Sequence, residues 1–267
     1  METSPQPWIE TLRRSHDALR SRVEPLTDDQ LRQRSYASEW SIAQVLSHLG
    51  SGAEIFGMFI DAGLSGAEPP GREALQPIWQ AWNDKDPRAQ ASDALAADVA
   101  LVTRLESLDD GERASIRLAL FGMDIDLVGL ARMRLGEHAV HSWDVAVALD
   151  PAARLAADAV NLLVDTIGQV AARAGKPGGR QLTASVVTTA PARSLTLAVG
   201  DGVTLEPAPP AQPVATGGAA AADEAKVRLP AEALIRLVYG RLDPAHTPPV
   251  EAAGVDVDEL RAIFPGF

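Results

Sequence analysis

Hydrophobic residues recur at the spacing of an amphipathic helix through the first 150 residues of the chain. The predicted helices span residues 8–23, 41–62, 72–82, 87–108 and 127–149. Ser41, with Gln44 three residues later, has the form of a capping box and predicts where the second helix begins. In the first helix His16 lies near the edge of the apolar stripe, so we expect it either to face solvent or to lie at the edge of the core. Residues 114–121 fit either a strand or a loop.

The pattern changes after Pro151. Residues 152–174 are predicted to form one more helix, which ends at a cluster of Gly and Pro. Alternating and β-branched runs then predict antiparallel strands at residues 181–189, 193–199, 202–206 and 226–229. Residues 207–222 are rich in Pro, Ala and Gly and predict a long loop.

The two patterns predict two domains. Two last helices are expected at residues 231–240 and 255–264, so the second half of the chain mixes helices with strands. The fold class is therefore α+β. We expect a four-helix bundle at residues 1–150 and a smaller α+β domain with an antiparallel sheet at residues 151–267.

Two segments of the predicted bundle offer groups that could bind a metal. Glu137 and His141 are four residues apart and lie about 40° from each other on one helix, with Asp144 near the same line. His48 lies in an apolar stretch of the helix at residues 41–62. With these faces inward, the three ligands would form a site of the catalytic zinc type with one open position. The spacing alone favours a simpler interpretation, a solvated acidic helix face and a core histidine, because such spacings are common.

The composition excludes several classes of function. Of the 267 residues 46% are hydrophobic and 22% are charged, as in soluble globular proteins. A formal charge of -12 argues against a nucleic-acid partner, because no basic stripe can neutralise phosphates. No segment approaches the ~18 to 20 apolar residues that span a bilayer, and the N-terminus lacks a signal pattern, so we expect a cytoplasmic protein without a membrane partner. The chain has no cysteine, so sulfur chemistry would need a thiol carried by a ligand.

Two sets of residues resemble the motifs of a known family. The first set consists of Trp40, Ser41, His48, Leu49, Arg134, Glu137, His141 and Asp144. In order and separation it resembles the N-terminal half of the mycothiol-dependent maleylpyruvate isomerase family, a branch of the DinB-like four-helix metalloproteins. The second set resembles that family's sterol-carrier-like C-terminal domain and consists of Leu229, Pro230, Ala231, Glu232, Ala233, Leu234, Leu237, Tyr239, Gly240 and Arg241. The resemblance spans nearly the whole chain, and the first set is the stronger of the two.

The resemblance implies that His48, Glu137 and His141 hold a divalent metal, usually zinc. His138, about 60° from His141 around the helix, is a weaker alternative to Glu137. Asp144 either orients a metal ligand or only solvates the helix. The implied thiol is mycothiol, which would lose its proton near neutral pH when bound to the metal, because the cation stabilises the thiolate.

The resemblance also implies substrate-binding residues. An isomerase of the maleylpyruvate type must hold a dicarboxylate and stabilise an enolate, and arginines suit both tasks through paired hydrogen bonds. Arg241 resembles the functional arginine of the family's second domain, and Arg134 is a second catalytic candidate. For each, the alternative is a surface salt bridge. Trp40, Trp143 and Asp144 are the expected cofactor-binding residues.

We therefore expect a zinc-dependent, mycothiol-using isomerase or S-transferase. Thiolate attack on a small electrophile gives cis-trans isomerisation when the thiol is expelled again, and S-transfer when the adduct remains. Two alternatives stay open: a metal-containing binding or regulatory module without turnover, and a DinB-like hydrolase that uses zinc-bound water. The expected partners are a small-molecule thiol and an electrophilic substrate, and the expected assembly is a monomer or homodimer.

Overall fold

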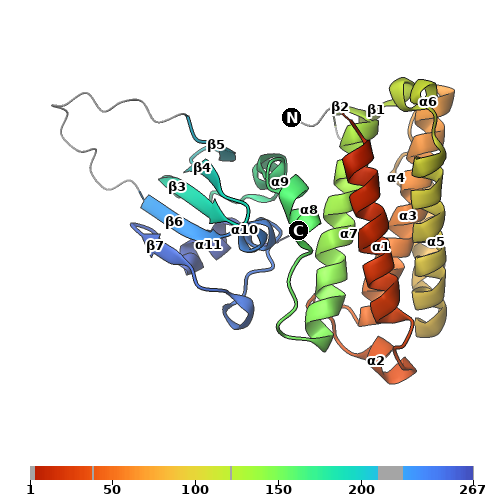
Figure 1. Cartoon of the computed structure of the whole chain (residues 1–267), viewed down its shortest axis with the longest axis horizontal. Coiled ribbons are helices and arrows are strands. Elements are labelled where there is room, and N and C mark those ends of the chain that lie inside the picture. Colours follow the sequence, from red (N-terminus) through yellow and green to blue (C-terminus); the bar gives the residue numbers. More distant parts are fainter. Residues whose placement is uncertain (1–3, 38, 121, 210–224, 267) are drawn as a thin grey trace. The chain divides into compact units, whose positions relative to one another are not determined.

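The computed structural model describes residues 4–37, 39–120, 122–209 and 225–266. The chain forms two compact units, Met1–Ala159 and Val160–Phe267. Where the structure describes the chain, the first unit has helices and one two-stranded hairpin, and the second combines a sheet with helices, so the predicted α+β class is confirmed (Figure 1). The division falls inside α8 (Ala157–Leu163), a little after the boundary expected at residue 150.

Four long helices make up the body of the first unit: α1 (Gln6–Val23), α3 (Ile42–Ser65), α5 (Pro87–Ser107) and α7 (Leu127–Leu149). Helix α3 packs against α5 and α7, and α1 packs against the same two helices (Figure 1). Three shorter helices lie between them in the chain: α2 (Asp28–Arg32), α4 (Arg72–Asn83) and α6 (Asp110–Ser115). The packing of α3 on α7 is what the predicted metal site requires.

The start of α3 is fixed by its own side chains. Ser41 Oγ accepts the backbone N–H of Gln44 at 3.2 Å, and the side-chain oxygen of Gln44 accepts the N–H of Ser41 at 2.8 Å. The predicted capping box is confirmed. His48 lies two turns inside this helix, where the backbone is rigid.

The segment at residues 114–121 contributes a strand. β1 (Arg117–Leu120) pairs antiparallel with β2 (Met123–Asp126). Leu118 and Leu120 are buried while their neighbours in β1 are exposed, which is the period-two pattern of a half-buried strand. Asp126 then caps α7, because its carboxylate accepts the N–H of Gly129 at 2.8 Å.

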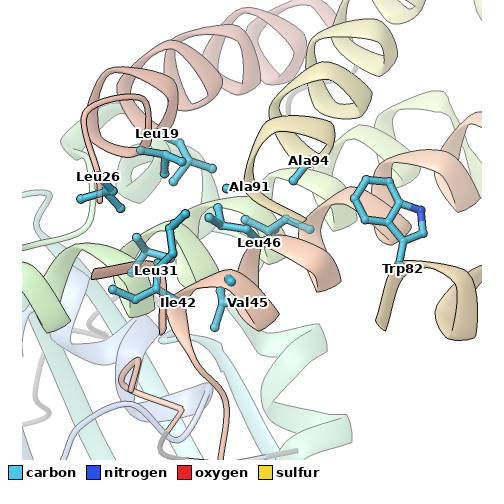
Figure 2. Packing of buried hydrophobic residues seen from close by; sticks show 13 residues of the cluster. Leu19, Leu26, Leu31, Ile42, Val45, Leu46, Trp82, Ala91 and Ala94 are labelled. Carbon is cyan, nitrogen blue, oxygen red and sulfur yellow. The ribbon is translucent and has the colours of Figure 1, made fainter. Parts of the chain in front are cut away.

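One end of the bundle is filled by an apolar cluster (Figure 2). It includes Leu19, Leu31, Ile42, Leu46, Trp82, Ala91 and Ala94. Burial of each large apolar side chain contributes about 1.5–3 kcal/mol. Gly50 is needed here, since a Cβ at this position would lie 2.3 Å from the ring of Trp82. Trp82 is therefore a core residue.

The second unit is built on a five-stranded sheet in the order β5-β4-β3-β6-β7. The strands are β3 (Leu182–Thr189), β4 (Arg193–Val199), β5 (Val203–Pro207), β6 (Ala225–Pro230) and β7 (Glu251–Ala253). Neighbouring strands are antiparallel except β3 and β6, which are parallel. The pattern had not indicated β7, which is short and exposed.

Helices complete the second unit: α9 (Ile167–Ala174), α10 (Ala231–Val238), the 3-10 helix Pro244–His246 and α11 (Val257–Ile263). The single helix expected at residues 152–174 is in fact α8 and α9. The break coincides with Thr166, whose hydroxyl donates to the carbonyl of Leu163 at 3.1 Å and so competes with the helical backbone.

Most of the predicted loop, residues 210–222, lies outside the described residues. Within the described chain, none of the helices combines the length and the apolar character that a membrane crossing requires.

Candidate metal centre

His48 from α3 meets Glu137 and His141 from α7. One ligand atom from each residue lies within 4.8 Å of the other two. Nε2 of His48 is 3.4 Å from Oε2 of Glu137, and Nε2 of His141 is 3.6 Å from the same oxygen. The structure thus brings together the three residues predicted as metal ligands, from two helices about 90 residues apart in the chain.

These separations suit a shared ion better than direct hydrogen bonds. Strong charge-assisted N–H···O bonds are about 2.7–2.9 Å long. Ligand atoms about 2.0–2.2 Å from a tetrahedral zinc ion are roughly 3.3–3.6 Å apart. Two imidazoles and one carboxylate are also a donor set of known catalytic zinc sites. The three side chains therefore fit a divalent ion of this kind.

Asp144 lies directly beside His141. Its Oδ2 lies 2.8 Å from Nδ1 of His141, and its side chain is fully buried. A proton on Nδ1 leaves Nε2, the nitrogen that faces Glu137, with a free lone pair for a cation. Of the two interpretations of Asp144, solvation of the helix does not fit a fully buried carboxylate.

Neighbouring charges shift the pKa values of Glu137 and His141 in opposite directions. Desolvation acts to raise the pKa of Glu137, but the interactions of its carboxylate with the imidazoles of His141 and His48 outweigh it and hold this pKa well below its usual range. Desolvation likewise acts to lower the pKa of His141, but the carboxylates of Asp144 and Glu137 raise it overall. The same carboxylate charge that favours a proton on His141 would favour a bound cation.

The two predicted tryptophans lie in different surroundings. The ring of Trp40 is 5.3 Å from that of His48 and 6.4 Å from that of His141, and it is partly exposed. Trp40 therefore forms one wall of the site. Trp143 is buried against Tyr36, at 4.8 Å between ring centroids, and its N–H donates to the carbonyl of Ala153. Its predicted role in cofactor binding stays a prediction.

Arg134 and His138 belong to a second, buried cluster. Arg134 Nη2 is 2.8 Å from one oxygen of Asp98, and Nε2 of His138 is 2.9 Å from the other. His138 thus faces Asp98, and the alternative in which it replaces Glu137 is not supported. The ion pair of Arg134 is in the interior and not, as the alternative had it, at the surface. Its predicted contact with substrate stays a prediction.

The sequence interpretation missed Asp98 and misplaced His16. His16 neither faces solvent nor lies at the edge of the core but is fully buried, with Nδ1 2.7 Å from Asp98. A signal was available, because His16 continues the buried stripe of Leu12 and Leu19, and Asp98 lies in line with Ala94 and Leu101. Polar residues on such stripes indicate a buried pair.

Arg241 lies in the second unit, just after α10. It is half-buried, and its Nη1 donates to the carbonyl of Tyr239 at 2.7 Å. Its predicted catalytic role stays a prediction.

The fold and the site together define a class: a helical bundle that carries a candidate divalent-metal centre, followed by an α+β unit. The family model described as the mycothiol maleylpyruvate isomerase N-terminal domain matches residues 12–146, more than half of the chain. The chain therefore belongs to this family of enzymes, as the motifs predicted. The matched region contains all three candidate ligands.

Solved structures resemble the whole chain. The crystal structure of the mycothiol-dependent maleylpyruvate isomerase has a TM-score of 0.68 at 14% identity, and the match covers 95% of each chain. A variant of that enzyme with one histidine replaced by alanine gives 0.68 at 13% identity, with the same coverage. At this identity the likeness shows the fold. The comparison with curated proteins gives no match.

Proposed function

We propose that this protein is a zinc-dependent enzyme that uses mycothiol to isomerise, or to conjugate, a small electrophile of the maleylpyruvate type. The observation that carries the proposal is the meeting of His48, Glu137 and His141 inside the region matched by the family model. Family membership supports the thiol and the reaction class. The ligand geometry supports the metal.

The metal would be held by Nε2 of the two histidines and a carboxylate oxygen of Glu137. When bound, a zinc ion lowers the pKa of a coordinated thiol, which supplies the nucleophile that a chain without cysteine lacks. About two fifths of the side-chain surface of His48 and of Glu137 is exposed, so a small ligand has access to this side of the bundle.

Other residues of the chain prepare the site. Asp144 keeps the Nδ1 proton of His141 in place, which fixes the ring for metal binding. Trp40 offers an apolar face beside the two imidazoles, against which part of the thiol or the electrophile can pack. Trp143 and Arg241 are further candidates for contacts to cofactor and substrate.

The reaction class is nucleophilic addition of a thiol to an activated double bond or a similar electrophile. Expulsion of the thiol after bond rotation gives isomerisation, and retention of the adduct gives S-transfer. Reduced thiol is available in a reducing compartment, which favours a cytoplasmic location. A monomer or a homodimer is compatible with this function.

Turnover assays test the proposal. We expect the zinc-loaded protein to consume maleylpyruvate only when mycothiol is present, and the His48→Ala variant to be inactive under the same conditions. Turnover without thiol would favour a metal hydrolase. Thiol and metal binding without turnover of any electrophile tested would favour a binding module.

A further inference from the structure

A buried network in the bundle has no role in the function proposed above. Asp98 of α5 accepts hydrogen bonds from Arg134 at 2.8 Å and His138 at 2.9 Å, both on α7, and lies 2.7 Å from Nδ1 of His16 on α1. All four residues are at most 2% exposed. One carboxylate therefore joins three of the four long helices.

The fourth helix is joined through a backbone carbonyl. Arg134 Nη2, which binds Asp98, also donates to the carbonyl oxygen of Leu49 on α3 at 2.9 Å. Leu49 directly follows His48 in the chain. Since Arg134 is one helical turn before Glu137, the contact between α3 and α7 lies within one turn of ligands on both helices.

Gly52 leaves room for the guanidinium of Arg134 beside α3. A Cβ at position 52 would lie 2.9 Å from Nη1 of Arg134, closer than side-chain atoms normally approach. The guanidinium therefore rests directly on the turn of α3 that follows His48. Asp98 holds it there, and a charged group in this interior needs such a partner.

We propose that Arg134, held by Asp98, is a positioning residue that sets α3 against α7 so that His48 reaches the ion bound by Glu137 and His141. This inference rests on the proposed metal site. Metal–ligand distances tolerate changes of only about 0.2 Å, whereas helices that contact each other through apolar side chains can shift by more. A directional bond beside His48 restricts that shift.

The competing interpretation is that the network only stabilises the bundle. The two interpretations predict different metal affinities for variants that lose a similar amount of folding stability. Arg134→Lys keeps the charge, but the lysine side chain is one bond shorter, so its ammonium does not reach the position of Nη2, the nitrogen that contacts both Asp98 and Leu49. His16→Gln weakens the same network on the α1 side and leaves the contact between Arg134 and Leu49 intact, so it is the matched control.

The test is zinc affinity, measured by competition with a chromophoric chelator, together with the d–d absorption spectrum of the cobalt-loaded protein and the thermal midpoint of each variant. We expect Arg134→Lys to bind zinc about 10–100-fold more weakly, with an altered cobalt spectrum. His16→Gln should lower the thermal midpoint but keep zinc affinity within about threefold and leave the spectrum unchanged.

Each outcome decides between the interpretations. The positioning role would be overturned if Arg134→Lys had the zinc affinity and the cobalt spectrum of wild type. It would also be overturned if Arg134→Lys and His16→Gln weakened zinc binding equally. If Arg134→Lys does not fold, Gly52→Ala takes its place, because its methyl group displaces the guanidinium while every charge remains; unchanged affinity there overturns the inference too. Failure of the wild type to bind zinc or cobalt would instead overturn the proposed function, and this inference with it.

Discussion

The bundle contains two clusters of histidine and carboxylate with opposite properties. In the open cluster the side chains of His48 and Glu137 are 37% and 42% exposed, and that of His141 is 11% exposed. The Nε2 atoms of the two histidines lie 3.4 and 3.6 Å from Oε2 of Glu137. In the closed cluster, the side chains of Asp98, Arg134 and His138 are at most 2% exposed, and their contacts are 2.8–2.9 Å long. Residue type alone does not distinguish a metal site from a structural network. Exposure and the spacing of the polar atoms do.

This comparison predicts its largest effect on stability at Asp98. Asp98→Asn leaves the buried charge of Arg134 without its counter-charge, so we expect a loss of about 3–5 kcal/mol in the free energy of unfolding. The matched change in the open cluster, Glu137→Gln, should cost the metal-free protein less than about 1 kcal/mol, because the group is partly exposed. Urea unfolding of both variants without metal measures the difference. Similar losses of unfolding free energy in the two variants would mean that burial does not distinguish the two clusters.

The open cluster should dominate activity. His48→Ala removes one of the three proposed ligands, and we expect thiol-dependent turnover to fall by at least about 100-fold. Replacing a residue that only hydrogen-bonds to a metal ligand usually has a smaller effect, about 10–100-fold. Unfolding of the metal-free variant should differ little from wild type, since His48 is partly exposed. A variant that retains zinc and most of its turnover would remove His48 from the ligand set.

A smaller effect is expected at Asp144, the buried carboxylate next to Nδ1 of His141. Asp144→Asn weakens the hold on Nδ1 of His141, and we expect zinc affinity to fall about 10–100-fold. Ser142→Ala is a suitable control because Ser142 lies in the same turn but contacts His138 at 3.2 Å. Zinc titration of both variants measures the difference, and equal affinity in the two would contradict the orienting role of Asp144.

The smallest effect concerns the pH dependence of stability. Desolvation acts to raise the pKa of Asp98, but His138, His16 and Arg134 outweigh it and hold the pKa well below its usual range. Because an unfolded Asp titrates near about pH 3.9, the stabilisation by Asp98 is fully present above that pH and is lost as the pH falls toward the folded-state pKa. The advantage of wild type over Asp98→Asn should therefore shrink only below about pH 4. Chemical unfolding at a series of pH values tests this, and an advantage that vanished already at pH 6 would point to the histidines instead.

Local signals in the sequence were sufficient for the bundle and for the capping box at Ser41. The meeting of His48 with Glu137 and His141 was implied by the resemblance to the family, because the spacing alone favoured a solvated helix face and a core histidine. The sequence was not sufficient for the contact between Arg134 and Leu49. That contact depends on the packing of α3 against α7 and on the space left by Gly52, which no local pattern encodes. The same limit applies to the partner of His16. Its place on the stripe of Leu12 and Leu19 indicated burial, but the position of Asp98 opposite it on another helix depends on the packing.

The most direct test of the account is the metal content of the purified protein and of Glu137→Gln, by elemental analysis after loading with zinc and removal of the excess. We predict about one zinc ion per chain in wild type, with binding lost or at least about 100-fold weaker in the variant, while circular dichroism shows the same fold. Equal zinc content in the two proteins, or none in the wild type, would contradict the claim that this triad is a metal centre.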